Sequence, residues 1–366
     1  MDRAEIAESS PLAPEPRAGA QDPPRIVLFA WCPGAIVYLD ALAAAGAPPL
    51  LVVTGPSSPP GLLAGACERL GAILEACADV NEPAFVARVA ALAPDLLIVA
   101  GCSQILRDPL LRTPKLGAVN LHPSLLPEYR GREPLFWAIL RGERRVGITA
   151  HRMTSAVDAG PILLQRQVTI PDRATSASLA RVVDQEGAAL VAEIVAMAQG
   201  GALPEGRLPV DPGSHVPPLR PEHGLVDWTR SAEELDRLVR ACAGELYAFT
   251  FFDGMRLYLL EAHTVRGGPV GGVDPPGTIL SMHGSAIAIL TAKGLLVVTR
   301  WLLMGRGHSG REIAKALALQ PRDRFTANPA FRRQVPGRSA SEIARPGLAK
   351  ATRCALSAKA GPGAGP

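Results

Sequence analysis

Short apolar runs alternate with segments of helical pattern through the first half of this chain. Each run has the length of a buried strand, and each intervening segment is long enough for a helix that covers a sheet. The predicted strands are 25–31, 50–54 and 96–100, and the predicted helices between them are 35–45, 62–70 and 82–92. Strands that alternate with helices form βαβ units, so we expect an α/β fold with a mostly parallel sheet.

A different pattern follows the Pro- and Gly-rich stretch at 201–221. Strands are predicted at 247–252 and 255–261, and the Asp253-Gly254 pair between them is a strong signal for a two-residue hairpin. Further strands are predicted at 277–280, 286–291 and 295–302. Several short strands joined by tight turns are typical of a small all-β domain, and we expect a barrel.

These patterns divide the 366 residues into two domains with tails. The predicted parts are a disordered leader at 1–24, an α/β domain at 25–200, a linker at 201–221, a β-rich barrel domain at 222–306, and a helical segment with a low-complexity basic tail at 307–366. Ser231 and Glu234 have the spacing of a capping box, which predicts a helix at the start of the barrel domain.

The net charge of +4 is unevenly distributed along the chain. Residues 331–366 hold seven Arg and Lys and one Glu, which leaves a net charge of −2 for the rest. A body that is not basic weakens any interpretation based on nucleic-acid binding. No window approaches the ~18 apolar residues of a membrane span, and the leader lacks the apolar core of a signal peptide. The six cysteines show no CxxC spacing, so we expect a cytoplasmic protein with reduced thiols.

A polar stretch after the apolar segment 117–119 carries the first candidate catalytic residues. Asn120 and His122 are two residues apart, so their side chains share one face of a predicted strand. Pro123 and Pro127 then exclude a helix and indicate a stiff loop. Because groups at the carboxyl end of a strand are well placed for chemistry in open α/β sheets, we take Asn120 and His122 as catalytic candidates.

Asp158 is the third candidate catalytic residue. Folded over the strand end, its carboxylate would orient the imidazole of His122 and stabilise the imidazolium, while Asn120 would donate to an oxygen that becomes negative. Asn, His and Asp without a Ser or Cys nucleophile indicate direct transfer to an incoming nucleophile, not an acyl-enzyme. Ser124 lacks the Gly-flanked elbow of a serine hydrolase. His151 is interpreted as a structural histidine.

Three separated blocks of sequence resemble the folate-dependent formyltransferases. They are Asn-Leu-His-Pro-Ser-Leu-Leu-Pro-Glu-Tyr-Arg-Gly at 120–131, Gly-Ile-Thr-Ala-His-Arg-Met at 147–153 and Asp-Ala-Gly at 158–160. Arg-Pro-Glu at 220–222 and Val-Asp-Trp at 226–228, with the β-rich stretch after them, are similar to the C-terminal barrel of the methionyl-tRNA formyltransferase branch. Some nucleotide-sugar formyltransferases have a similar domain. The resemblance implies a Rossmann-like formyltransferase domain followed by an OB-like barrel.

The resemblance also implies 10-formyltetrahydrofolate as formyl donor, an amine as acceptor and no metal. Asn120 and His122 would polarise the formyl oxygen, and Asp158 would pair with His122 and help to remove the amine proton. The implied folate-binding residues are Ser103, Gln104, Ile105, Leu106, Thr154 and Val157. The implied acceptor-binding residues are Trp31, Ser124, Leu125, Tyr129 and Arg130. Alternatively, Ile105 and Leu106 are hydrophobic core residues without a role in binding.

The stretch 54–61 departs from methionyl-tRNA formyltransferases, in which a basic, Gly-containing insertion follows the second strand. Here it reads Thr-Gly-Pro-Ser-Ser-Pro-Pro-Gly, without Arg or Lys, although phosphate-rich tRNA calls for cationic side chains near the site. We therefore expect a small-molecule amine as acceptor: an amino sugar nucleotide, an amino acid derivative or a biosynthetic intermediate. Initiator methionyl-tRNA is the alternative. The turn at 31–34 lacks the Gly/Ser-rich loop that would bind the phosphate of glycinamide ribonucleotide. This argues against glycinamide ribonucleotide as the acceptor.

Two other functions stay open on sequence alone. The β-rich domain could bind single-stranded nucleic acid through Tyr247, Phe249, Phe251 and Phe252, although a core position explains these aromatic residues more simply. The same Asn, His and Asp could also support hydrolysis of formyl-folate by water. The presence of a second domain after the catalytic half favours transfer.

Overall fold

The structure, a computed structural model, describes residues 22–56, 61–244, 246–265 and 274–330. The chain divides into two compact units, Met1–Asn120 with Ala188–Glu205 and Leu121–Gly187 with Gly206–Pro366. Two of the three boundaries fall inside regular elements, β5 (Ala118–His122) and α6 (Ser176–Gln199). Residues 1–21 of the predicted disordered leader, residues 331–366 of the predicted tail and residues 57–60 of the stretch 54–61 lie outside the described residues.

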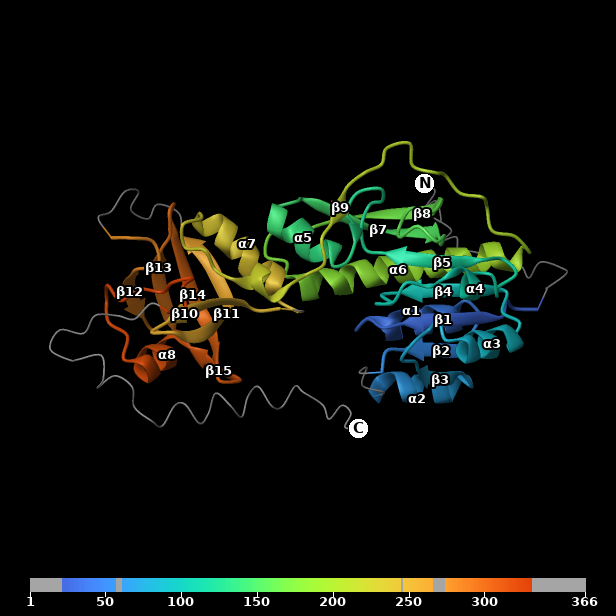
Figure 1. The fold of residues 1–366 in the computed structure, drawn as a ribbon, viewed down its shortest axis with the longest axis horizontal. Helices are drawn as coiled ribbons and strands as arrows, with labels where there is room; N and C mark the ends of the chain where they lie inside the picture. Colours follow the sequence, from blue (N-terminus) through green and yellow to red (C-terminus); the bar gives the residue numbers. More distant parts are fainter. Residues whose placement is uncertain (1–21, 57–60, 245, 266–273, 331–366) are drawn as a thin grey trace, which may run out of the picture. The chain divides into compact units, whose positions relative to one another are not determined.

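A seven-stranded sheet has the order β3-β2-β1-β4-β5-β7-β8 (Figure 1). Besides β5, its strands are β1 (Ile26–Ala30), β2 (Leu51–Thr54), β3 (Ile73–Ala76), β4 (Leu96–Ala100), β7 (Arg145–Arg152) and β8 (Ile162–Thr169). β1 pairs in parallel with β2 and β4, β2 pairs in parallel with β3, and β7 pairs antiparallel with β8. Every residue of β1 and β4 is buried, as expected of strands covered on both faces. The predicted mostly parallel sheet is confirmed.

Helices connect most of these strands, as the sequence predicts. They are α1 (Ala35–Ala44), α2 (Gly61–Leu70), α3 (Pro83–Ala91), α4 (Asp108–Leu111), α5 (Pro134–Arg141) and α6. α5 begins with a proline, whose missing N–H needs no partner at that position, and ends at Gly142 with φ +78°. In α6, the side chains of Leu190, Val191, Ile194 and Val195 are buried. Their spacing makes one apolar stripe, which belongs to the core of the first unit.

The stretch predicted as a linker, 201–221, contains regular structure. His215 and Val216 form β9, which pairs in parallel with β6 (Arg130–Gly131). A 3₁₀ helix follows at Pro221–Gly224. The segment before β9 also bonds to β8, since Arg207 and Ile162 exchange two backbone hydrogen bonds. Residues 206–217 are therefore bonded to β6 and β8 within the second unit.

A second, antiparallel sheet is built from the C-terminal half. Its strands are β10 (Ala248–Phe252), β11 (Met255–Val265), β12 (Ile279–His283), β13 (Ala286–Leu290), β14 (Leu295–Leu303) and β15 (Arg306–Ser309), in the order β10-β11-β14-β13-β12 with β15 beside β14. Asp253 and Gly254 both have positive φ, which the predicted two-residue hairpin turn requires. Phe249, Phe251 and Phe252 are buried and Tyr247 is half exposed, which supports the core interpretation for the three phenylalanines.

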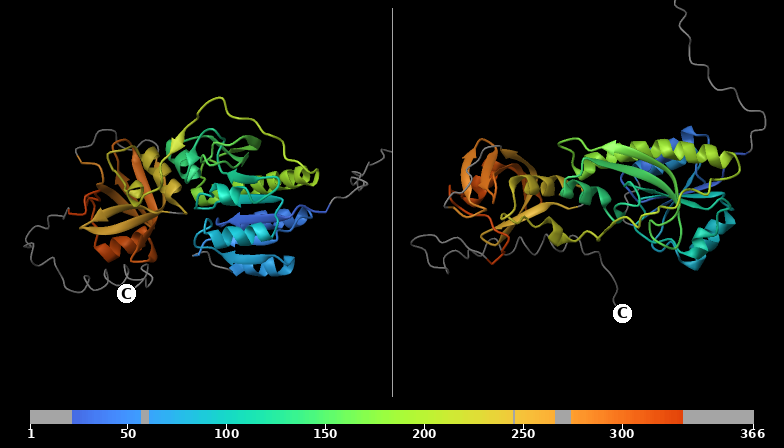
Figure 2. Two further views of the ribbon diagram at one scale, coloured as in Figure 1. Left: turned by 45° about the vertical axis from the view of Figure 1, so that its right-hand side comes forward. Right: turned by 90° about the horizontal axis from the view of Figure 1, so that it is seen from above.

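Residues near the end of the described chain complete this sheet. Thr326 bridges to Phe251 on β10, and Arg324 bridges to Thr278, directly before β12. The two edges are thus joined through one short segment, which closes the sheet around its core. α7 (Ala232–Cys242), with the predicted capping box of Ser231 and Glu234, precedes the sheet, and α8 (Gly310–Leu317) packs beside β14 and β15 (Figure 2). Among all helices in the described ranges, none has the length and apolar character needed to cross a membrane.

Candidate active site

β5 carries two of the predicted catalytic residues. The strand extends from Ala118 through His122, so Asn120 and His122 lie within it and not beyond its end. Their spacing of two residues places both side chains on one face of the sheet. His122 is buried, with 4% of its surface exposed, whereas Asn120 is half-buried.

The loop after β5 returns to His122 and fixes its tautomer. Tyr129 adopts the left-handed backbone conformation, with φ +58°, and its carbonyl oxygen lies 2.9 Å from Nε2 of His122. A carbonyl only accepts hydrogen bonds, so Nε2 carries the hydrogen and donates it to Tyr129. In the neutral imidazole, Nδ1 is therefore the nitrogen with the free lone pair.

Asp158 lies against the same histidine, as predicted. Its Oδ2 is 3.6 Å from Nδ1 of His122, and the same oxygen accepts a hydrogen bond of 2.9 Å from the backbone N–H of Gly131. Asp158 has φ +50°. The turn after it also needs glycine, because a Cβ on Gly160 would lie 1.8 Å from the carbonyl oxygen of Arg152. The loop thus presents the carboxylate to the end of β5.

His151 joins this cluster, although the sequence indicated only a structural role. Nε2 of His151 lies 3.6 Å from Oδ1 of Asp158, and Nδ1 lies 3.0 Å from the carbonyl oxygen of Arg152. His151 is 2% exposed. The carboxylate of Asp158 therefore stands between two histidines, His122 and His151. The available signal was the position of His151 near the end of a strand, seven residues before Asp158.

The environment lowers the pKa values of both Asp158 and His122, which keeps both groups deprotonated. Burial on its own raises the pKa of Asp158, but the contacts from His151, His122 and the N–H of Gly131 outweigh burial and hold it at about 2. Burial lowers the pKa of His122, and the opposing effects of Asp158 and of the Tyr129 carbonyl are smaller. The resting site therefore combines a carboxylate with a neutral imidazole.

The segment that the resemblance assigns to the folate follows β4. Ser103 is exposed, and Gln104 is held by two hydrogen bonds, from its Nε2 to the carbonyl of Ala78 and from the N–H of Val80 to its Oε1. Leu106 is buried, whereas Ile105 is 61% exposed. Leu106 thus occupies a core position, and Ile105 presents an apolar surface to solvent.

The other predicted folate-binding residues lie in the loop before Asp158. Thr154 is exposed and its hydroxyl donates to the carbonyl of Ala156, which shapes the turn. Val157 is 47% exposed. This large apolar side chain, like that of Ile105, is exposed, and it directly precedes Asp158 in the chain.

The residues predicted to bind the acceptor fall in different places. Trp31 directly follows β1, and its indole Nε1 is buried without a hydrogen-bond partner among the described residues. Arg130 is on β6, and its Nε is also buried without a hydrogen-bond partner among the described residues. Ser124 is fully buried and donates to the carbonyl of Glu128. Leu125 and Tyr129 are half-buried.

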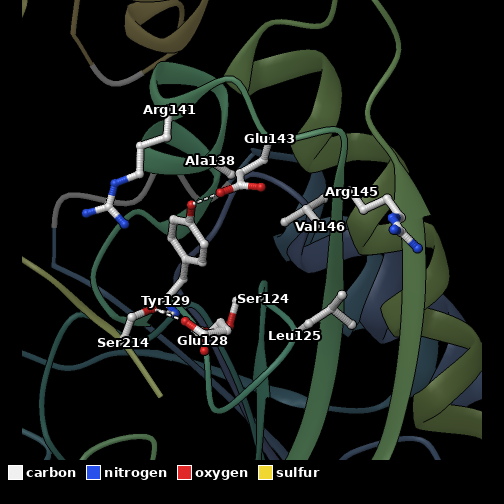
Figure 3. Close-up of a pocket in the computed structure, with 10 residues that line it drawn as sticks. All are labelled: Ser124, Leu125, Glu128, Tyr129, Ala138, Arg141, Glu143, Arg145, Val146 and Ser214. Carbon is white, nitrogen blue, oxygen red and sulfur yellow. Dashed lines mark hydrogen bonds between the residues drawn. The ribbon is translucent and has the colours of Figure 1, made fainter.

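Ser124, Leu125 and Tyr129 line one cavity of about 410 Å³ (Figure 3). The hydroxyl of Tyr129 donates to Glu143 at 2.6 Å, and the guanidinium of Arg141 lies over the Tyr129 ring. Burial, together with the bond to Glu143, raises the pKa of Tyr129 to about 12, so the phenol remains protonated. The side chain of Tyr129 thus points into the cavity while its carbonyl points to His122.

Within the described part of the chain, no group of three or more His, Cys, Asp and Glu side chains is placed to hold a metal ion. The cluster of His122, Asp158 and His151 has the composition of a proton-transfer site.

Comparison with protein families gives two matches. A family described as "Formyl transferase" matches residues 66–194. A second, described as "Formyl transferase, C-terminal domain", matches residues 218–315. The two matches contain both the cluster around Asp158 and the antiparallel C-terminal sheet.

Curated relatives match most of the chain. A methionyl-tRNA formyltransferase of Pelobacter propionicus is 36% identical over 232 residues, which is 62% of this chain and 70% of the relative. A methionyl-tRNA formyltransferase of Pelotomaculum thermopropionicum is 31% identical over 294 residues, 77% of this chain and 91% of the relative.

Solved structures show the same fold at lower identity. A variant of HypX from Aquifex aeolicus has a TM-score of 0.57 and 19% identity, over 86% of this chain and 51% of HypX, so the chain spans about half of HypX. WlaRD, a sugar 3N-formyl transferase, has a TM-score of 0.55 and 14% identity, over 75% of this chain and 96% of WlaRD. At these identities the likeness concerns the fold alone.

Proposed function

The chain belongs to the formyltransferase family, and from that premise we propose that it transfers the formyl group of 10-formyltetrahydrofolate to a primary amine of a small acceptor. The observation that carries the proposal is the cluster of His122, Asp158 and His151, with Asn120 on the same strand as His122. This set supplies a base, a carboxylate that stabilises the protonated base, and an uncharged donor.

In the proposed reaction His122 accepts the proton of the attacking amine at Nδ1. That nitrogen holds the free lone pair because Nε2 donates to Tyr129. As the amine nitrogen bonds to the formyl carbon, its proton passes to Nδ1 and forms an imidazolium. Asp158 stabilises this cation from 3.6 Å without taking the proton itself, since its own pKa is about 2.

Asn120 has the complementary role in the proposal. The formyl oxygen becomes negative when the amine attacks, and an amide N–H donates to it without changing charge. Once protonated, Nδ1 of His122 is a second donor of the same site. Collapse of the tetrahedral intermediate then breaks the bond to the folate nitrogen, and the proton held by His122 is available to that leaving nitrogen.

The exposed apolar side chains of Ile105 and Val157 support a folate ligand. Ligand sites are lined mainly by apolar side chains, with a few polar groups that fix the orientation of the ligand. Ile105 lies in the loop that follows β4, and Val157 directly precedes Asp158. We assign them to the contact with the pterin ring.

Electrostatics favour a small acceptor over tRNA. Affinity for tRNA comes mainly from phosphate contacts by Lys and Arg, but the sequence has no such residue at 54–61, and the excess positive charge lies in 331–366. The second candidate is initiator methionyl-tRNA, since two relatives that share over 30% identity with this chain are methionyl-tRNA formyltransferases.

Parallel assays separate the two acceptors. Purified protein of residues 1–366 and a variant that lacks residues 337–366 are incubated with 10-formyltetrahydrofolate and either a panel of small primary amines or charged initiator tRNA. Products are measured by mass spectrometry at two salt concentrations. We expect formylation of a small amine that survives truncation and depends little on salt. Efficient formylation of the tRNA that falls steeply with salt and is lost on truncation would favour the second candidate instead.

A further inference from the structure

The segment Gly206–Pro217 passes along the loop that carries Tyr129 and Gly131, and we infer that it positions the catalytic histidine, with Ser214 as the positioning residue. The inference rests on the proposed function, because it assumes that His122 is the base. It concerns a stretch that the sequence indicates only as a linker. Its basis is a set of hydrogen bonds within the second unit.

Ser214 makes four hydrogen bonds to the loop. Its backbone N–H donates to the carbonyl of Pro127 at 3.3 Å, and its carbonyl accepts from the N–H of Arg130 at 2.9 Å. Its hydroxyl oxygen accepts from the N–H of Tyr129 at 3.0 Å and donates to the carboxylate of Glu128 (Figure 3). One residue thus engages four consecutive residues of the loop, 127 to 130.

These bonds orient the peptide group that contacts His122. The carbonyl of Tyr129 and the N–H of Arg130 belong to one peptide unit, and in a trans peptide they point in opposite directions. The N–H is bonded to the carbonyl of Ser214, and the C=O is bonded to Nε2 of His122. The peptide is therefore held between Ser214 on one side and the histidine on the other.

The loop needs such support because its backbone is strained. Tyr129 has φ +58°, a conformation that a bulky side chain adopts only when its surroundings impose it. The bond from its N–H to Ser214 Oγ holds that conformation. Gly131, two residues further along the loop, donates its backbone N–H to Asp158. The same loop therefore contacts both His122 and Asp158.

The segment is itself fixed on either side of Ser214. Gly213 has φ +65°, and a Cβ at this position would lie 2.1 Å from the carbonyl oxygen of Pro127. On one side Arg207 exchanges backbone bonds with Ile162, and on the other the indole of Trp137 donates to the carbonyl of Pro217. Ser214 is thus presented by a segment bonded at both ends.

Four variants test the inference. Ser214→Ala removes the hydroxyl, Ser214→Thr keeps it, and Gly213→Ala forces the segment away from Pro127. Ser281→Ala is the matched control, since Ser281 is an exposed serine on β12. Each protein is labelled with ¹⁵N-histidine, and the titration of His122 is followed by NMR, with its signal assigned from His122→Gln. Thermal melting confirms that each variant is folded.

The titration of His122 is the direct readout. The groups that act on His122 by charge are Asp158 and His151, and the carbonyl of Tyr129 raises its pKa. A loosened carbonyl therefore moves the midpoint of His122 to lower pH. We expect this shift in Ser214→Ala and a larger one in Gly213→Ala, whereas Ser214→Thr and Ser281→Ala keep the wild-type midpoint. Unchanged midpoints in both Ser214→Ala and Gly213→Ala overturn the inference, even if these variants melt earlier.

Turnover gives the second readout, with the amine that the acceptor assays identify. Loss of the two hydrogen bonds that the hydroxyl makes to the loop should lower kcat by about twofold to tenfold in Ser214→Ala, while the KM for 10-formyltetrahydrofolate stays constant. A change in KM alone speaks against positioning. If the wild-type protein transfers no formyl group to any acceptor, the proposed function fails, and the NMR titration still decides whether the segment positions His122.

Discussion

The carbonyl oxygen of Tyr129 accepts a hydrogen bond from Nε2 of His122 over 2.9 Å. This contact decides which nitrogen of the imidazole is basic, because only Nδ1 remains free to take up a proton. Nδ1 is also the nitrogen that lies 3.6 Å from Asp158. The proton-accepting nitrogen and the carboxylate that stabilises the resulting cation are thus adjacent.

The pH dependence of turnover should follow His122. Since burial lowers the pKa of His122 from its usual 6.5, its basic form persists below that pH. We expect the acid limb of the kcat/KM profile to have its midpoint below pH 6.5. In Asp158→Asn the charge that opposes this shift is removed, so any residual activity should show a still lower midpoint. An acid limb centred above pH 6.5 would contradict a neutral buried base.

Replacement of Asp158 by Asn should leave the fold intact and remove most of the turnover. The imidazolium that forms on His122 then lacks its stabilising charge, and losses of about 10²-fold or more are typical of such sites. The control is Asp40→Asn, at an exposed position on α1. Steady-state kinetics and thermal melting of both variants provide the test. Near-normal kcat in Asp158→Asn would reject the proposed mechanism.

His151→Gln should also lower kcat, although less than Asp158→Asn. The contact of His151 with Oδ1 is one of those that hold Asp158 in its charged form and orientation, and loss of one such contact should cost about tenfold in rate. His263→Gln, at an exposed position on β11, is the matched control. Should His151→Gln match the wild type in kcat, His151 has only the structural role that the sequence indicated.

Low pH should reduce the stability of the fold by protonating Asp158. Its pKa in the folded protein is about 2 against an ordinary value of 3.8, so its contribution is fully present above the ordinary value and is lost as pH falls towards 2. The shift corresponds to roughly 2 kcal/mol in the free energy of unfolding. The free energies of unfolding of the wild type and Asp158→Asn are measured with urea at several pH values. Their difference should shrink by up to about that amount below pH 4. A difference that does not vary with pH would show that the carboxylate is not stabilised in this way.

Tetrahydrofolates should protect the protein against heat by mass action. At a concentration about 100-fold above Kd, 5-formyltetrahydrofolate should add about 2.7 kcal/mol to the free energy of unfolding, which raises Tm by roughly 5–10 °C. p-Aminobenzoylglutamate, which lacks the pterin, is the control ligand. An unmoved melting curve together with no heat of binding in calorimetry would mean that the donor is wrongly assigned.

Local patterns in the sequence were sufficient for most elements of the fold. The apolar run at 96–100 coincides with β4, because a strand buried on both faces must be apolar throughout. The turn at Asp253-Gly254 and the capping box at Ser231 and Glu234 form as predicted. In each of these cases the physical cause lies within a few neighbouring residues.

The parts that could not be predicted depend on contacts between distant segments. β9 is two residues long and has no periodicity of its own, because its partner β6 lies 85 residues earlier. The place of His151 beside Asp158 depends on where the loop between β7 and β8 folds back. Likewise, nothing around Ser124 in the sequence indicates that its hydroxyl is turned inward to Glu128. Such positions need the three-dimensional structure.

The division of the chain has a consequence for the order of events during synthesis. The first unit ends at Asn120 but also requires residues 188–205, whose buried side chains, including Leu190 and Ile194, belong to its core. A ribosome that adds roughly 5–20 residues per second needs on the order of ten seconds to make the intervening stretch. During that interval the apolar surface that α6 will cover is exposed, and a chaperone can bind it.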